Sequence, residues 1–221
     1  MLPPTIKSLR PLLMTLLIVL ITTRVGIELS MHLLPMHLSW IMAFGVYYLS
    51  IEAALWFLKI KSGLSRPRYT WSLKPLPALK PLLVGLVLPA LLPLGVFVAN
   101  YERVPATTFA YIVVFAAINP FFEEVFWRGV LNQLPISGVK RQVTSALLFS
   151  FSHYFLWGSY WLSNPKVLIP TCLTTFIMGW CWMWFYQRDG RLLYPVLSHM
   201  AVDIINLSIA VFMGIDLVGA R

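Results

Sequence analysis

The sequence predicts an all-α membrane protein, a polytopic helical bundle with about seven transmembrane helices. Of its 221 residues, 59% are hydrophobic and only 11% are charged, whereas a soluble globular domain is about 25% charged. Several apolar runs reach the ~20 residues that a helix needs to cross a bilayer core. The basic residues gather at the ends of these runs. These observations favour one compact helical domain in a membrane.

Seven apolar segments account for the predicted helices. A basic, proline-rich connector over 59–80 contains lysines and arginines but no acidic residue, which predicts a segment lying at the membrane interface. Pro89 and Pro93 predict a kink in the third helix. The aromatic run from Trp180 to Tyr186 fits an interfacial belt. The predicted helices are 9–27, 38–58, 82–99, 106–134, 143–157, 167–186 and 192–213.

Two parts are expected within this single domain. Residues 1–105 supply the first three helices and the connector, and they carry no recognisable catalytic pattern. Residues 106–221 supply helices four to seven and contain most of the polar residues that fall inside apolar segments. We therefore expect the catalytic core in helices four to seven.

The net charge of +9 would suggest nucleic acid as the partner of a soluble protein. Here the charges flank apolar runs, so the expected partner is the anionic headgroups of the bilayer, and no nucleic acid. With a cytoplasmic N-terminus and seven spans, most basic residues fall on the cytoplasmic side. The exceptions are Arg24, Arg103, Lys166 and Arg221. The positive-inside rule then predicts a multi-pass protein of the cell's inner (plasma) membrane, with its C-terminus outside.

The fourth apolar segment carries two adjacent carboxylates, Glu123 and Glu124, together with Arg128. Ionisable groups at membrane depth are costly, face the protein interior and usually mark a functional site. Glu124 and Arg128 are four residues apart, share a helix face and can pair. Glu123 points roughly 100° away, on the face of Asn119, and is free for proton transfer. The alternative is a buried charge cluster that only fixes helix packing, but an unpaired second carboxylate serves that purpose poorly.

Two further polar sets lie in later helices. His153 is in helix five, while His199 and Asp203 are four apart on one face of helix seven, with Asn206 nearly continuing that face. A single intramembrane histidine is often only hydrogen-bonded to a neighbouring helix. Counted at ~1.5 Å per residue from the basic helix ends, however, these sets and the glutamates lie in the cytoplasmic halves of their helices. We therefore expect them to line one cavity open toward the cytoplasm.

Two glutamates and two histidines around a wet cavity suit hydrolysis. A glutamate can take a proton from water as a general base, and a histidine can hydrogen-bond the oxyanion of a tetrahedral intermediate. Neither the His-Glu-x-x-His pair of zinc proteases nor a Gly-x-Ser-x-Gly elbow occurs in the chain.

The ordered series Glu123-Glu124-x-x-x-Arg128, Phe149-x-x-x-His153 and His199-x-x-x-Asp203 resembles the motifs of the CPBP family. These CAAX-protease and bacteriocin-processing proteins are membrane glutamic proteases related to Rce1-type prenyl-protein endopeptidases. The resemblance covers about half of the chain. It implies an intramembrane endopeptidase that hydrolyses a membrane-anchored protein or peptide near the cytoplasmic face, without a metal or other cofactor.

The resemblance also implies roles for these residues. Glu123 and His153 would activate water, Glu124 and Arg128 would support the site, and His199 would stabilise the oxyanion with the residue four positions later. That residue is typically asparagine in prenyl-protein endopeptidases, and here it is an aspartate. An ionised Asp203 cannot donate to an oxyanion. It would have to be protonated, orient His199, or leave the role to Asn206.

Two alternatives stay open. Glu123, His153, His199 and Asp203 are also suitable ligands for a metal-dependent membrane protease. A non-enzymatic bacteriocin-immunity or transport protein is the other alternative, although transporters usually show internal repeats and none is visible here.

Overall fold

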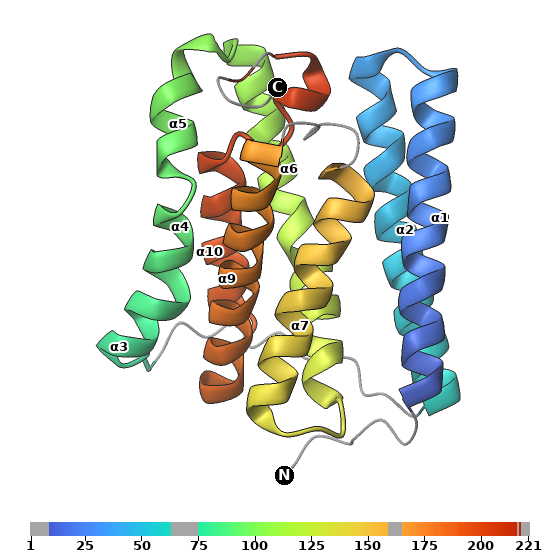
Figure 1. Ribbon diagram of the computed structural model, residues 1–221, viewed down its shortest axis with the longest axis vertical. Coiled ribbons are helices and arrows are strands. Elements are labelled where there is room, and N and C mark those ends of the chain that lie inside the picture. The colour runs from blue at the N-terminus through green and yellow to red at the C-terminus, as the bar shows by residue number, and fades with distance from the viewer. Residues whose placement is uncertain (1–8, 63–74, 159–164, 216, 218–221) are drawn as a thin grey trace.

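The structure is a computed structural model that describes residues 9–62, 75–158, 165–215 and 217 (Figure 1). Within these residues every regular element is helical, which confirms the all-α prediction. Successive spans run alternately up and down the bundle, with α1 (Leu9–Leu33) beginning at one end and α10 (Leu193–Ile205) ending toward the other. Five helical stretches are long and apolar enough to cross a membrane: Arg10–Leu33, Leu38–Lys61, Leu79–Arg103, Ala106–Gln133 and Leu168–Asp189. The chain is therefore a multi-pass membrane protein.

Helices α1 (Leu9–Leu33) and α2 (Met36–Ser62) form an antiparallel hairpin. Lys59 and Lys61 belong to the last turn of α2, so the predicted start of the connector at 59 is wrong. Helix propagation continues there because lysine is a good helix former. Residues 63–74 of the predicted connector lie outside the described part of the chain.

The third span is helical but interrupted, as its prolines predict. Pro89 cannot donate to the carbonyl of Gly85, and a π-helical turn precedes it. A turn at Leu92 and Pro93 separates the two halves of the span. Its successive pieces are α3 (Leu79–Leu82), η1 (Leu83–Val87), α4 (Leu88–Leu91), α5 (Leu94–Asn100) and η2 (Tyr101–Arg103).

The remaining helices form the core of the molecule. They are α6 (Ala106–Glu124), which continues into the π-helical η3 (Val125–Val130) and the 3-10 turn η4 (Leu131–Gln133), then α7 (Gly138–His153) with the π-helical η5 (Tyr154–Gly158), α9 (Pro165–Asp189), α10 (Leu193–Ile205) and η6 (Val211–Met213).

Two predicted boundaries in this core are wrong. Helix α7 begins at Gly138, ahead of the predicted position 143, because the extended backbone of Ser137 (ψ 155°) starts the helix there. Helix α10 ends at Ile205 and does not reach 213. Leu207 has a φ of 55°, a left-handed conformation that terminates an α-helix. The predicted seventh span is therefore a 13-residue helix followed by a turn.

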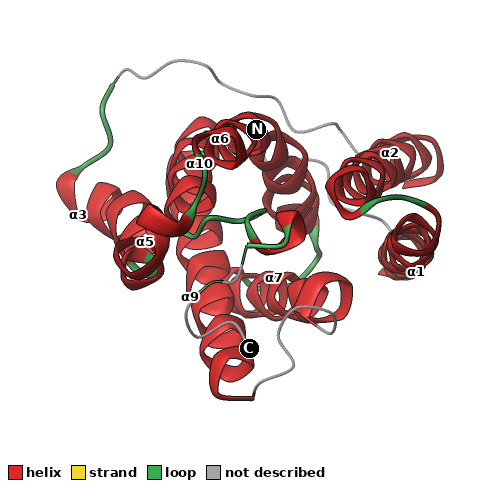
Figure 2. Ribbon diagram, turned by 90° about the horizontal axis from the view of Figure 1, so that it is seen from above, coloured by secondary structure: helices red, strands yellow, loops and turns green. Residues whose placement is uncertain are grey.

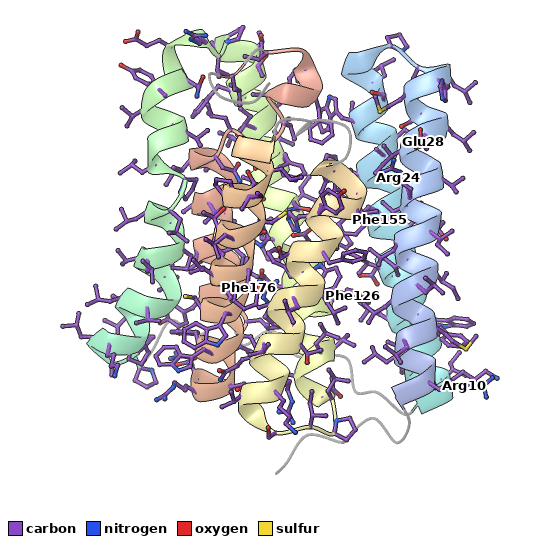
Figure 3. The ribbon with its side chains drawn as sticks, in the orientation of Figure 1. Arg10, Arg24, Glu28, Phe126, Phe155 and Phe176 are labelled. Atoms are coloured by element: carbon purple, nitrogen blue, oxygen red, sulfur yellow. The ribbon has the colours of Figure 1, made fainter. Side chains whose placement is uncertain are left out.

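Viewed from above, α6, α7, α9 and α10 form a central group, with the α1–α2 hairpin on one side and α3–α5 on the other (Figure 2). The hairpin docks through aromatic rings, because Phe44 lies 4.6 Å from both Phe115 of α6 and Trp157 of η5, measured between ring centroids. Arg24 adds a polar contact. Its guanidinium donates to the carbonyl oxygen of Phe155 at 2.6 Å (Figure 3).

Gly85 is a close contact between the third span and α9. A Cβ atom at this position would lie 2.4 Å from Cδ2 and 2.7 Å from Cβ of the fully buried Phe185. We expect Gly85→Ala to destabilise the protein by about 1–3 kcal/mol, the usual cost of overpacking, measured as a lower midpoint of thermal unfolding in detergent. Gly95→Ala is the control, since a Cβ atom there meets nothing within 4 Å. Equal losses in both variants would contradict the packing argument.

Candidate active site

Glu123 and Glu124 lie in the last turn of α6, where the helix passes into the π-helical η3. Both are buried, with 2% and 0% of their surfaces exposed. The four-residue spacing to Arg128 has the expected consequence, because Arg128 Nε lies 3.2 Å from Glu124 Oε2 and both side chains are fully buried. A π-helical turn inside an α-helix is frequently found at functional sites.

Aromatic rings hold Arg128 in place. Its guanidinium carbon lies 4.1 Å from the ring centroid of Phe149 on α7 and 4.8 Å from that of Trp182 on α9. Cation–π contacts of this kind are strongest when they are desolvated. Three helices thus converge on one buried cation.

His199 on α10 brings the two glutamates together. Its Nδ1 lies 2.8 Å from Glu124 Oε1, and its Nε2 lies 3.5 Å from Glu123 Oε2. The imidazole stacks on the ring of Trp182, with 4.5 Å between centroids. Trp182 is itself anchored, since its Nε1 donates to Ser198 Oγ at 2.9 Å. Glu124 therefore has two partners, Arg128 and His199, where its spacing in the sequence predicted only Arg128.

Asp203 lies one turn beyond His199, and its carboxylate accepts hydrogen bonds from neighbouring side chains. Asn119 Nδ2 donates to its Oδ2 at 3.1 Å, and Tyr48 of α2 donates to Asn119 Oδ1 at 3.3 Å. His199 Nε2 is 3.6 Å from Asp203 Oδ1. Asn206 instead lies at the end of α10, where its side-chain oxygen bonds Ser208. The same Ser208 hydroxyl lies 3.0 Å from Asp203 Oδ1, so Asn206, the residue after the last one of α10, is linked to Asp203 through Ser208.

His153 ends α7 at the edge of the cluster. Its Nδ1 lies 2.9 Å from the carbonyl oxygen of Phe149. Because a carbonyl only accepts, Nδ1 carries a proton in this bond, and Nε2 is an acceptor when the ring is neutral. His153 is within electrostatic range of Glu123 and His199, but no hydrogen bond or ion pair joins it to Glu123 in the described part of the chain. The structure therefore gathers the predicted site residues at one place, with His199 at its centre and His153 at its rim.

Residues 105–205 match the family described as type II CAAX prenyl endopeptidase, Rce1-like. The match covers 101 of the 221 residues. It runs from the start of α6 to the end of α10, so it contains Glu123, Glu124, Arg128, His153, His199 and Asp203. Comparisons with curated proteins and with solved structures found no match. The family described in this way consists of proteases, so the match supports a peptidase activity with a membrane-associated protein or peptide as substrate.

Several residues that contact the cluster were not predicted from the sequence. Trp182 was expected in an interfacial belt, but it is fully buried beneath Arg128 and His199. Tyr47 and Tyr48 reach the cluster from α2, outside the Rce1-like segment. An apolar helix gives no sequence signal for such a contact, because any face of it is compatible with burial.

A metal centre does not follow from the geometry of these side chains. Among the described residues, no group of three or more His, Cys, Asp or Glu side chains is arranged to hold a metal ion.

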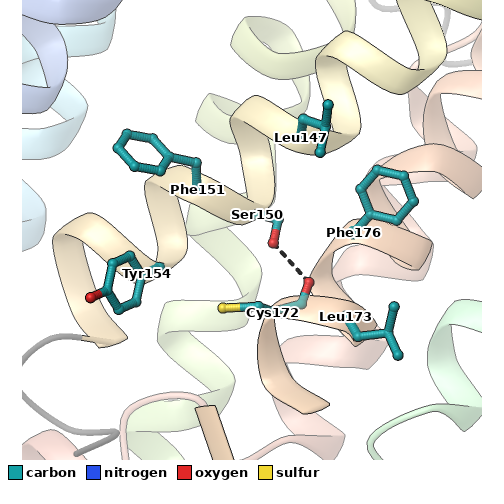
Figure 4. A pocket seen from close by; sticks show the side chains of 7 residues that line it. All are labelled: Leu147, Ser150, Phe151, Tyr154, Cys172, Leu173 and Phe176. Atoms are coloured by element: carbon teal, nitrogen blue, oxygen red, sulfur yellow. Dashed lines mark hydrogen bonds between the residues drawn. The ribbon is translucent and has the colours of Figure 1, made fainter. Parts of the chain in front are cut away.

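A shallow apolar hollow of about 430 Å³ lies between α7 and α9 (Figure 4). Ser150 Oγ donates across it to the carbonyl oxygen of Cys172 at 2.7 Å. The hollow occupies a different flank of α7 from Phe149 and His153. Its lining, Leu147, Ser150, Phe151, Tyr154, Cys172, Leu173 and Phe176, contains none of the predicted site residues.

Proposed function

We propose that the protein is an intramembrane endopeptidase in which Glu123 activates the water that cleaves a membrane-tethered protein or peptide. One observation carries this proposal. Two adjacent glutamates of α6 both face His199 of α10, while only Glu124 is paired with a buried arginine. The pairing gives the two carboxylates different environments, which is how enzymes assign them different roles.

Glu123 is the proposed general base. Its Oε2 is buried and accepts no hydrogen bond from the described residues, so it can accept a proton from water. As the water oxygen bonds to the peptide carbonyl carbon, Glu123 takes that proton. It then returns the proton to the leaving nitrogen as the carbon–nitrogen bond breaks, which restores the carboxylate. The acceptor Nε2 of His153 orients the same water through its second hydrogen.

His199 is the proposed oxyanion donor. Glu124 Oε1 accepts a hydrogen bond from the Nδ1–H of His199, with 2.8 Å between oxygen and nitrogen, and this bond aims Nε2 toward Glu123. When Nε2 also carries a proton, the ring is an imidazolium and can donate from Nε2 to the oxyanion of the tetrahedral intermediate. Asp203, which accepts from Asn119 and lies 3.6 Å from Nε2, orients His199 in this proposal. Asn206 has no part in it.

The proposed orientation places the N-terminus in the cytoplasm and the C-terminus outside, in the plasma membrane. The end of the bundle where α1 begins and α2 ends carries most of the basic residues of the described helices: Arg10, Lys59, Lys61, Lys80, Lys140, Arg141 and Arg188. Such a rim suits the anionic cytoplasmic leaflet. Residues 1–105 and 106–221 keep their proposed division into a supporting part and a catalytic core.

The substrate of the proposed reaction is a membrane-tethered chain with its scissile bond near the cytoplasmic surface. The family description names CAAX prenyl endopeptidases, so a farnesylated peptide ending in a CAAX sequence is the first probe. We expect the purified protein in detergent to cleave this peptide faster than its lipid-free counterpart, and to retain the activity in the presence of a strong chelator. Reverse-phase separation of the products measures both rates.

Each other outcome of this assay favours an alternative. If the chelator removes the activity and zinc restores it, the site is metal-dependent. If the folded protein cleaves neither the farnesylated peptide nor a peptide with a transmembrane tail, the proposed function is wrong and the non-enzymatic alternative gains support.

A further inference from the structure

We propose that Tyr47 of α2 is a positioning residue for Glu123, so that the N-terminal hairpin forms part of the active centre. This inference rests on the proposed function of Glu123. Tyr47 lies outside the segment that matches the Rce1-like family. It is nevertheless 1% exposed and buried against the catalytic core.

The direction of the Tyr47 hydroxyl follows from its partner on η3. Trp127 Nε1 lies 3.1 Å from the Tyr47 oxygen, and both side chains are buried. An indole N–H can only donate, so the Tyr47 oxygen is the acceptor in this bond. The hydroxyl hydrogen of Tyr47 must then point toward a different group.

Glu123 is the group that fits this requirement. The buried Glu123 carboxylate lies within electrostatic range of the Tyr47 hydroxyl, and an ionised carboxylate only accepts. In this proposal the order of donation is Trp127 to Tyr47, which the structure contains, and then Tyr47 to Glu123. A hydrogen bond from a hydroxyl to a carboxylate is shorter and stronger than one between neutral groups. With Tyr47 and His199 both facing it, the Glu123 carboxylate is held in one orientation toward water.

The neighbouring residue shows that α2 contacts the cluster at a second point. Tyr48 donates to Asn119, which donates in turn to Asp203. The ring of Tyr48 stacks on Phe122 of α6 with 4.5 Å between centroids. In this proposal, two successive tyrosines of α2 act on the cluster, Tyr47 on Glu123 and Tyr48 on Asp203 through the amide of Asn119. The hairpin therefore sets the positions of two of the three carboxylates around His199.

Tyr47→Phe tests the inference because it removes one oxygen atom and little volume. We expect kcat for the farnesylated CAAX peptide to fall roughly 10- to 100-fold, the effect of losing a hydrogen bond to a charged group, with KM changed by less than about twofold. In this proposal Glu123 acts in the chemical step and does not bind the substrate, so the substitution should lower kcat without raising KM. Tyr111→Phe on the exposed face of α6 should leave both constants unchanged.

Trp127→Phe is the matched variant. It breaks the same indole–hydroxyl bond but keeps the Tyr47 hydroxyl, and it loses more buried volume than Tyr47→Phe. We expect it to lower kcat less than Tyr47→Phe does. An equal or larger fall in Trp127→Phe would mean that the bond serves packing alone, and would overturn the inference.

Glu123→Gln separates this failure from failure of the proposed function. If Glu123→Gln is inactive while Tyr47→Phe keeps the kcat of the unmodified protein, only the role of Tyr47 is wrong. If folded Glu123→Gln still cleaves the peptide, the proposed role of Glu123 is wrong, and that of Tyr47 with it.

Discussion

Glu123→Gln is expected to lower kcat for peptide cleavage by about 10²–10⁴-fold, the usual contribution of a general base. The amide has nearly the shape of the carboxylate, and the side chain is 2% exposed, so the substitution changes proton affinity with little change in packing. Cleavage of the farnesylated CAAX peptide by purified protein measures the effect. The unfolding midpoint in detergent verifies that the variant folds.

Glu102→Gln is the control for this experiment. Glu102 is exposed at the end of the third span, where it accepts a hydrogen bond from Tyr101. Its substitution should leave kcat unchanged. Retention of full activity by a folded Glu123→Gln variant would rule out Glu123 as the base.

Arg128→Met is expected to cause the largest loss of stability, about 3–5 kcal/mol, because it leaves the buried carboxylate of Glu124 without its cation. Neither Arg128 nor Glu124 has any exposed side-chain surface. The substitution also removes the cation held between the rings of Phe149 and Trp182. The yield of folded protein and its unfolding midpoint are the measurements.

Arg188→Met provides a matched control, since Arg188 also lies over a tryptophan ring, with its guanidinium carbon 4.3 Å from Trp184, but is exposed. We expect a change of less than about 0.5 kcal/mol there. The double variant Glu124→Gln/Arg128→Met should recover part of the stability because no unpaired charge remains. Similar midpoints for the two single arginine variants would show that the buried ion pair contributes little to folding.

Local spacing predicted those features of the site that depend on a single helix. The four-residue interval between Glu124 and Arg128 places both on one face, and they pair in the structure. Pro89 and Pro93 predicted a kink in the third span, and the structure has a turn at Leu92 and Pro93. The position of His199 and Asp203 on one helix face also follows from their spacing, and their side chains lie 3.6 Å apart.

Contacts between helices were beyond the same reasoning. The pattern along α6 left Glu123 free but could not indicate that it faces His199, since that depends on how α10 is rotated and at what depth it lies. The end of α10 at Ile205 depends on a single residue with left-handed backbone, Leu207. Leucine rarely adopts this conformation, so the sequence does not predict it. Trp182 matched an interfacial belt because an aromatic residue is equally compatible with a membrane surface and with a buried ring under a histidine.

The sequence by itself determined the class of the molecule, its membrane location and which part of the chain carries the ionisable residues. These properties depend on composition and on the spacing of residues within one helix, and both can be read directly from the amino-acid sequence. Only the tertiary structure decided which carboxylate meets which histidine, and that α2 supplies tyrosines to the cluster. The physical reason is that an apolar helix can bury any of its faces in a membrane protein, so packing against its neighbours selects the face that meets the site.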